Sequence, residues 1–265
     1  MIHPQTTSTE LMSELNALLG RARKYGESDE ITLKRFEAKA RQLLKVKPIE
    51  GHNVLSALSQ LKGDLQKAVE HIDIALNLKA DAVLECNKAT LLINFGKFLE
   101  AQRFFKSGAT PERGEFTGHW RLGACCGAWH VLNDFCVMAK RMQLDLTNVD
   151  QALIGRVVQL MDQNSITDQD LGGMLEIAGS ILREERMYFL GEGSDVFVWD
   201  QDAIEKYVTI TFRLPVTSRR AIELDRELGR RLFADIADLP FAIMLHFESG
   251  LPSNERFAER SAEAR

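Results

Sequence analysis

Two glycines and a downstream lysine come closest, by residue type and spacing, to a site for chemistry. The segment "FLGEGSDVFVWDQDAIEK" holds Gly191 and Gly193 in a predicted turn, with Lys206 near the start of the next predicted strand. A glycine has no Cβ, so its backbone N–H can approach a phosphate closely, and a lysine supplies the opposite charge. This spacing supports one hypothesis for the chain, a nucleotide-binding enzyme.

The same segment resembles the glycine-rich loop of protein kinases, with Leu190, Gly191, Gly193 and Val198 at matching places. In that family the loop covers the phosphates of ATP. Here Val196 replaces the third glycine, and neither a His-Arg-Asp nor an Asp-Phe-Gly motif follows. Ser-His-Asp and Cys-His arrangements are not evident either. We therefore predict no catalytic residues and no cofactor, and we keep the enzyme as the alternative hypothesis.

Neither the cysteines nor the isolated histidines have the spacing of metal ligands. No two cysteines form a Cys-x-x-Cys pair, and three histidines have no ligand-like residue four positions on. We expect buried, reduced cysteines and no metal site. The residues concerned are Cys86, Cys125, Cys126 and Cys136, with His52, His71 and His246.

Tryptophan and histidine gather in the segment "GHWRLGACCGAWH". Trp120 and Trp129 are nine residues apart, and His119 and His130 are eleven apart, so the four cannot share one helix face. Two interpretations stay open. The four side chains line a pocket, or they pack between layers of helices with the histidines at the margins.

The elements that must position these residues are mostly helices. Residues 1–186 read as consecutive amphipathic helices, the first capped by Ser8 or Thr9 and the second starting at Ser28 or Asp29 and stopped by Pro48. The turns "KGD", "LKAD" and "FGK" are short, so consecutive helices are expected to be antiparallel. The loop 107–118 is the longest interruption.

Small residues recur at fixed distances from three predicted turns. Five residues after each turn residue stands an alanine, and seven residues before it stands another small residue. Small residues fit where stacked helix pairs bring their backbones close together. The turn residues are Gly63, Gly96 and Asp134, followed by Ala68, Ala101 and Ala139 and preceded by Ser56, Ala89 and Gly127.

This pattern resembles the tetratricopeptide repeat (TPR) family, whose unit of about 34 residues is a helix hairpin. The two turn glycines are 33 residues apart, and Ala75 and Gly108 supply a further small residue. Ala80 stands where a closing proline is usual, and the third unit comes 38 residues after the second. The resemblance covers 49–108 well and 115–143 less well. The alternative is a helical bundle without repeat ancestry.

The resemblance implies a concave surface lined by the first helix of each pair, which holds a peptide or a helix of another protein. Asparagine suits this surface because its amide both donates and accepts hydrogen bonds. The basic residues that grip a terminal carboxylate are missing at most matching places, so we do not expect carboxylate capture. The alternative role for each asparagine is a solvated surface residue. The predicted partner-binding residues are Asn53, Gln60, Asn87, Thr90, Asn94 and Arg121.

The sequence pattern changes at Met187, from helical spacing to aromatic and β-branched residues typical of strands. Residues 187–250 predict a small, mostly antiparallel α+β domain in the order β-β-β-α-β, with its clearest strand at 205–215, a helix at 217–237 and a closing strand at 240–249. A free sheet edge can pair with a second copy and give a homodimer. Residues 251–265 read as a flexible tail.

The helix 217–237 carries five arginines interleaved with acids, which indicates a solvated, salt-bridged face. A nucleic-acid-associated regulator is the second alternative, although the net charge of −5 does not favour it. The arginines are Arg219, Arg220, Arg226, Arg230 and Arg231.

Taken together, the sequence predicts a mainly α protein, with a TPR-like array of antiparallel helix hairpins followed by the small α+β domain. No apolar run long enough for a membrane span and no signal peptide are evident, so a cytoplasmic location is expected. The predicted function is a non-enzymatic scaffold, adaptor, chaperone or regulatory subunit that binds another protein.

Overall fold

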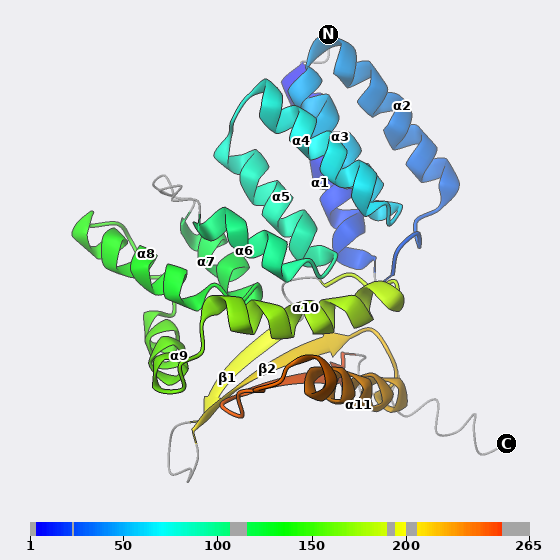
Figure 1. Cartoon of the computed structure of the whole chain (residues 1–265). Helices are drawn as coiled ribbons and strands as arrows, with labels where there is room; N and C mark the ends of the chain where they lie inside the picture. Colours follow the sequence, from blue (N-terminus) through cyan, green and yellow to red (C-terminus); the bar gives the residue numbers. More distant parts are fainter. Residues whose placement is uncertain (1–3, 23, 107–115, 190–193, 200–205, 251–265) are drawn as a thin grey trace, which may run out of the picture.

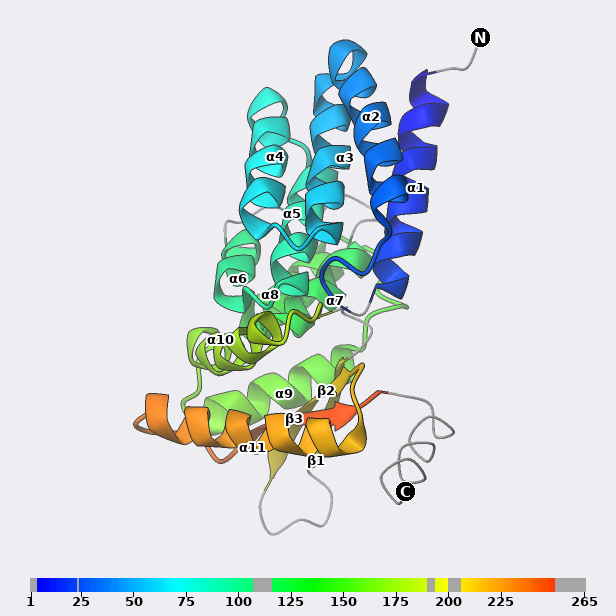
Figure 2. The ribbon, with the colours of Figure 1, turned by 90° about the vertical axis from the view of Figure 1, so that its right-hand side faces the viewer.

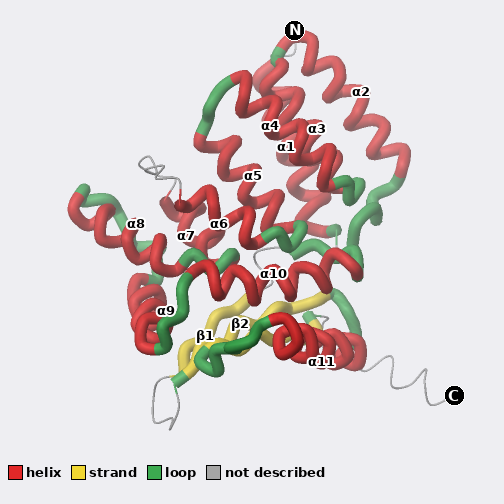
Figure 3. Tube along the Cα trace, viewed as in Figure 1, coloured by secondary structure: helices red, strands yellow, loops and turns green. Residues whose placement is uncertain are grey.

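The computed structural model describes residues 4–22, 24–106, 116–189, 194–199 and 206–250. Over these ranges the chain is mainly helical, as predicted (Figure 3). The first ten helices are α1 (Pro4–Arg21), α2 (Glu30–Val46), α3 (Pro48–Leu61), α4 (Leu65–Leu78), α5 (Ala82–Asn94), α6 (Phe98–Lys106), α7 (Phe116–Cys125), α8 (Trp129–Arg141), α9 (Gln151–Gln163) and α10 (Asp168–Glu184). They are followed by β1 (Ser194–Trp199), β2 (Tyr207–Leu214), α11 (Ser218–Asp235) and β3 (Ile243–Ser249).

Local sequence sets most of the helix starts. Side chains of aspartate or threonine at the N-cap accept a backbone N–H from the first turn, which replaces a hydrogen bond that the helix itself cannot make. Pro48 occupies the first turn of α3, where its missing N–H costs nothing. The capping residues are Asp29, Asp64, Asp81, Asp150, Thr167 and Thr217.

Glycine turns close three of the hairpins. Gly63 and Gly96 adopt positive φ angles of 75° and 63°, so the turns predicted at these residues are confirmed. The third turn lies at Gly127, with φ 77°, and not at Asp134, which is an exposed residue inside α8. The alignment on Asp134 was wrong because this type of helix end needs a left-handed residue, which glycine supplies without strain.

The fold has an upper block, the helices α1 to α5, and a lower block that contains the sheet and α11 (Figure 1). In Figure 1 α1 to α5 stand side by side, and α10 runs across their lower ends. Figure 2 shows the same layers from the side, with α10 above and the sheet and α11 below. The contacts of α10 with α6 on one side and with α11 and β3 on the other join the two blocks.

The sheet has the order β1-β2-β3. Strands β1 and β2 are antiparallel, whereas β2 and β3 are parallel, with Ile210 opposite Leu245. The predicted mostly antiparallel sheet is thus only half correct: α11 carries the chain back across the sheet, so β3 runs in the direction of β2.

The first strand predicted for this region does not pair with the sheet over 187–189. Met187 forms an isolated antiparallel bridge with Lys24, and the Phe189 N–H donates to the carbonyl of Asn94 at 2.9 Å. The Tyr188 hydroxyl donates to the carbonyl of Gln60. Carbonyls in the last turns of α3 and α5 lack the donor four residues on that a continuing helix would supply, and they hold this segment instead. The carbonyl of Gln60 also accepts the Gly63 N–H at 2.8 Å.

The buried apolar residues form two clusters. One joins α1 to α5 and includes Tyr188, and the other runs from Leu92 in α5 through α10 to Phe247 in β3. A chain of ring contacts between Phe98, Phe189 and Phe212 connects the helices with the sheet. The sheet therefore shares its core with the preceding helices, and the proposed domain boundary at 186 remains a prediction. No helix in the described ranges is both long and apolar enough to cross a membrane.

Candidate functional site

A cleft of about 330 Å³ opens between α1, α3 and α5, the first helices of three consecutive hairpins. We call it the amide cleft, because amide side chains from all three helices line it. Its lining residues are Met12, Asn16, Leu19 and Gly20 of α1, Asn53, Ser56, Ala57 and Gln60 of α3, and Asn87, Thr90, Leu91 and Asn94 of α5.

Helix geometry brings these residues together. The four lining residues of α3, and the four of α5, follow the spacing i, i+3, i+4, i+7, which is one face of a helix. Each residue of the α5 set lies 34 positions after its counterpart in α3, as Asn87 does after Asn53. Two successive hairpins therefore present the same face to the cleft.

Hydrogen bonds tie most of the polar side chains to the walls. The Asn87 Nδ2 group donates to Asn53 Oδ1 at 3.2 Å, which links α5 to α3. The Thr90 hydroxyl donates to the carbonyl of Cys86 at 2.8 Å, and the Ser56 hydroxyl donates to the carbonyl of Ala68 at 2.7 Å. The bond between the two asparagines uses neither the acceptor Asn87 Oδ1 nor the donor Asn53 Nδ2.

Gln60 differs from its neighbours. Its side chain is buried, with 5% of the residue exposed, yet its Nε2 group has no hydrogen-bond partner among the described residues. The main-chain carbonyl of Gln60 is occupied, because it accepts from the Tyr188 hydroxyl. A buried amide without a partner is costly and uncommon in folded proteins.

The cleft is uncharged. None of its twelve lining residues is ionisable. Its apolar walls come mainly from Met12, Leu19 and Leu91, and the rest of the surface offers amide and hydroxyl groups. Such a surface suits a ligand with hydrogen-bonding groups but no charge.

The structure brings together five of the six predicted site residues. Asn53, Gln60, Asn87, Thr90 and Asn94 all line the amide cleft. The sixth, Arg121, is an exposed residue of α7 outside the lining set.

Sequence reasoning missed the wall that α1 provides. Met12, Asn16 and Leu19 have the spacing i, i+4, i+7 in the sequence, but the first hairpin carries few of the repeat residues. The helical spacing alone was the signal that could have found this wall.

His130 lines a second cavity, of about 620 Å³, together with Asp162 and Asp168. Its Nδ1 lies 2.7 Å from Asp168 Oδ1, and its Nε2 lies 3.1 Å from Asp162 Oδ1. Burial lowers the pKa of His130, but hydrogen bonds and charge from Asp168 and Asp162 raise it by more, so the pKa lies above its ordinary value. The buried Asp168 also accepts the His130 N–H at 3.0 Å and so caps α8.

The tryptophans do not join His130 in this cavity. Trp129 is fully buried in the core, which favours the packing interpretation for this residue. Trp120 is half-buried, and its indole N–H donates to the carbonyl of Asn148 at 3.1 Å. The side chain of His119 lies outside the described residues.

Two histidines that looked isolated in the sequence meet in the structure. His52 of α3 and His71 of α4 have their Nδ1 atoms 3.2 Å apart, and burial lowers the pKa of both rings. Within the described ranges, no group of three or more histidine, cysteine, aspartate or glutamate side chains is arranged to hold a metal ion. Of the cysteines, Cys126 and Cys136 are buried as expected, whereas Cys86 and Cys125 are half-buried.

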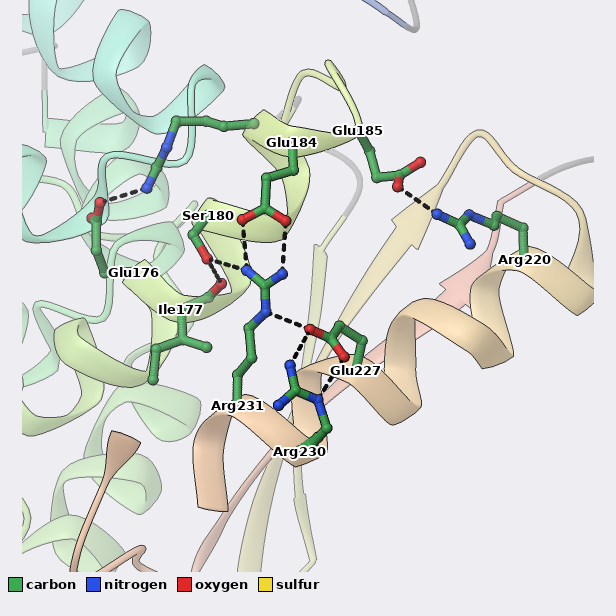
Figure 4. A network of polar contacts seen from close by, with 10 residues as sticks. Glu176, Ile177, Ser180, Glu184, Glu185, Arg220, Glu227, Arg230 and Arg231 are labelled. Carbon is green, nitrogen blue, oxygen red and sulfur yellow. Dashed lines mark hydrogen bonds and ion pairs between the residues drawn. The ribbon is translucent and has the colours of Figure 1, made fainter. Parts of the chain in front are cut away.

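Arginines of α11 pair with acids of α11 itself and with acids at the C-terminal end of α10 (Figure 4). The Arg231 guanidinium donates to both carboxylate oxygens of Glu184 at 2.7 Å and also to Glu227. Arg230 pairs with Glu227, and Arg220 pairs with Glu185. The contacts with Glu184 and Glu185 join α11 to the end of α10, and acids pair with four of the five arginines of the nucleic-acid hypothesis, Arg219, Arg220, Arg230 and Arg231.

Of the phosphate-site candidates, only Lys206 falls within the described residues. It is exposed and immediately precedes β2. Gly191 and Gly193 lie outside the described residues, so the structure gives no geometry for a phosphate at this loop.

Comparison with known proteins gives no family for this chain: no protein-family model, no curated protein and no solved structure matches it.

Proposed function

We propose that this protein binds another protein in the amide cleft and acts as a non-enzymatic scaffold, adaptor, chaperone or regulatory subunit of the TPR type. The observation that supports this proposal most directly is the convergence of amide side chains from α1, α3 and α5 on one cleft. Three consecutive hairpins contribute their first helices, which is the arrangement expected of a repeat array with a concave binding surface.

The chemistry of the lining residues supports a peptide ligand. Asparagine and glutamine side chains carry a donor and an acceptor at the spacing of a peptide group, so they can pair with an extended backbone whatever its sequence. The apolar contacts of Leu19 and Leu91 would receive small apolar side chains between these hydrogen bonds.

A pull-down from native lysate tests this proposal. The double variant Asn53→Ala, Asn87→Ala removes both partners of the hydrogen bond across the cleft, so it leaves neither group unpaired and should fold. We expect the wild-type chain to retain a partner that the double variant loses. The matched control is Arg121→Ala, which changes a predicted site residue outside the cleft and should retain the partner.

If the double variant keeps the same partner at the same yield, the amide cleft is not the binding surface. Turnover of a substrate by the purified chain without any partner would contradict the non-enzymatic role.

A further inference from the structure

We propose that the side chains of His52 and His71 form a two-histidine site for a divalent transition-metal ion of the class Zn²⁺, Ni²⁺ and Cu²⁺. The two rings come from the adjacent helices α3 and α4, and their Nδ1 atoms lie 3.2 Å apart although the residues are 19 positions apart in the sequence. Neither histidine lines the amide cleft, so this site goes beyond the proposed function and does not depend on it.

The spacing of the two nitrogen atoms fits coordination of one ion. Zinc binds an imidazole nitrogen at about 2.0–2.1 Å, so two nitrogens on one tetrahedral zinc ion lie about 3.3–3.4 Å apart. The observed 3.2 Å is close to this separation, and it also suits a hydrogen bond between the rings before an ion arrives. A small movement of the rings therefore replaces the hydrogen bond by coordination.

Both rings are in the form that a metal ion binds. Burial lowers the pKa of His52 and of His71, so both imidazoles are mainly neutral at pH 7. Neutral imidazole is a good ligand for zinc, copper and nickel. His130 and His246 each contact a carboxylate, which favours the charged ring, whereas His52 and His71 contact each other.

The helix hairpin holds the two rings in place. One turn after His52, the Ser56 hydroxyl donates at 2.7 Å to the carbonyl of Ala68, which lies one turn before His71. Ala68 is fully buried, so the two helices are in close contact at this point. A pair of ligands fixed on two packed helices loses little conformational freedom when an ion binds.

Two protein ligands make an open site. Within the described ranges, no third histidine, cysteine, aspartate or glutamate completes a metal-binding group. Both histidines are half-buried, and a four-coordinate ion takes its other two ligands from water or from a bound molecule. We therefore expect a reversible site that a chelator empties, unlike a closed structural zinc site on which folding depends.

Thermal unfolding of the full-length chain tests the site. The protein is prepared without a polyhistidine tag, treated with EDTA and dialysed. We expect Zn²⁺, Ni²⁺ or Cu²⁺ at ten times its Kd to raise the Tm by about 3 °C. Mg²⁺ at the same concentration should not change the Tm, because it prefers oxygen ligands.

Two single variants locate the ion. His52→Gln and His71→Gln should each weaken the metal affinity at least about tenfold, because each leaves only one imidazole. Each variant is compared with itself without metal, so that a change in its own stability cancels. The matched control is His246→Gln, because His246 lies in β3 and pairs with Asp225 at 2.8 Å. This control should keep the full metal-dependent shift.

Electron paramagnetic resonance of bound Cu²⁺ gives a second measurement that does not depend on stability. The spectrum of the wild-type chain should show coupling to two imidazole nitrogens, and that of either variant coupling to one at most.

Two outcomes overturn the proposal. One is a wild-type Tm that none of the three ions raises. The other is an unchanged metal affinity in His52→Gln or His71→Gln, which would place the ion elsewhere. Neither outcome bears on the amide cleft, because the test of partner binding uses Asn53 and Asn87.

Discussion

At the scale of single residues, the molecule holds two buried amides of the same type in opposite states. Gln102 donates from Nε2 to the carbonyls of Cys126 and Asp168 and so joins α6 to the ends of two other helices, whereas the buried Nε2 group of Gln60 has no partner among the described residues. Folding alone explains the first arrangement, because every buried polar group gains by finding a partner. The second arrangement is shared by the Tyr25 hydroxyl and the Trp129 indole N–H, which are also buried without a hydrogen-bond partner among the described residues.

His130 gives a prediction for the dependence of stability on pH. Its pKa in the folded protein lies above the unfolded value of about 6.5, because Asp168 and Asp162 favour the charged ring. A group whose pKa is raised by folding stabilises the protein fully below the unfolded pKa, and this contribution is lost as the pH rises through the folded pKa. His130→Asn should therefore lower the Tm more at about pH 5.5 than at about pH 8.5.

Thermal unfolding of the wild type and the variant across this range measures the difference directly. A gap between the two Tm values that stays constant or widens as the pH rises would contradict the raised pKa.

At the scale of the elements, two glycines fix the contact between α10 and the turn after α5. A Cβ on Gly179 would lie 2.0 Å from the carbonyl oxygen of Gly96, so the two backbones touch with no room for a side chain. Arg183, one turn further on α10, donates to the carbonyls of Phe95 and Gly96 and so adds two hydrogen bonds to the same contact. This contact sets the position of α10 beneath the upright helices in Figure 1.

We expect Gly179→Ala to destabilise the protein by about 3 kcal/mol, because backbone atoms must move to admit the methyl group. The control on the same helix is Gly173→Ala, where a Cβ would meet nothing within 4 Å. This variant should stabilise the protein by about 0.5–1 kcal/mol, since alanine is the better helix former. Denaturant unfolding of the two variants distinguishes them, and equal effects would contradict the close contact.

The elements also show what a sequence can predict. Asp29, Thr217 and the helical spacing indicated where helices lie, and the same spacing brought five of six site residues to one cleft. These features depend on residues a few positions apart. The cap expected at Ser8 or Thr9 was wrong, because α1 already begins at Pro4 and contains both residues. The parallel pairing of β3, the cap that Asp168 provides for α8 and the pairing of His52 with His71 depend on distant residues, and no local pattern indicated them.

At the scale of the whole molecule, the segment 187–189 connects the two hydrophobic clusters. Tyr188 belongs to the cluster of the first helices and bonds to the carbonyl of Gln60, while Phe189 belongs to the cluster that contains the sheet and bonds to the carbonyl of Asn94. Both carbonyls belong to residues that line the amide cleft. The base of the cleft and the sheet are therefore parts of one continuous structure.

This continuity predicts the effect of truncation. A chain that ends after Arg186 loses Tyr188, Phe189 and the sheet, and so exposes the apolar face of α10 that packs against them. We expect this truncated chain to unfold at a clearly lower temperature than the full chain, or to aggregate. An unchanged Tm for the truncated chain would show that residues 1–186 form an independent domain.

The central claim is that the amide cleft binds a partner protein, and site-specific photo-crosslinking tests it most directly. A photoreactive amino acid replaces Asn16, an exposed residue of the α1 wall, or, as the control, Arg121 on α7. On irradiation in native lysate, we predict a protein adduct from position 16 that the double variant Asn53→Ala, Asn87→Ala abolishes, and no such adduct from position 121. The absence of an adduct at position 16, or the same adduct from both positions, would contradict the claim.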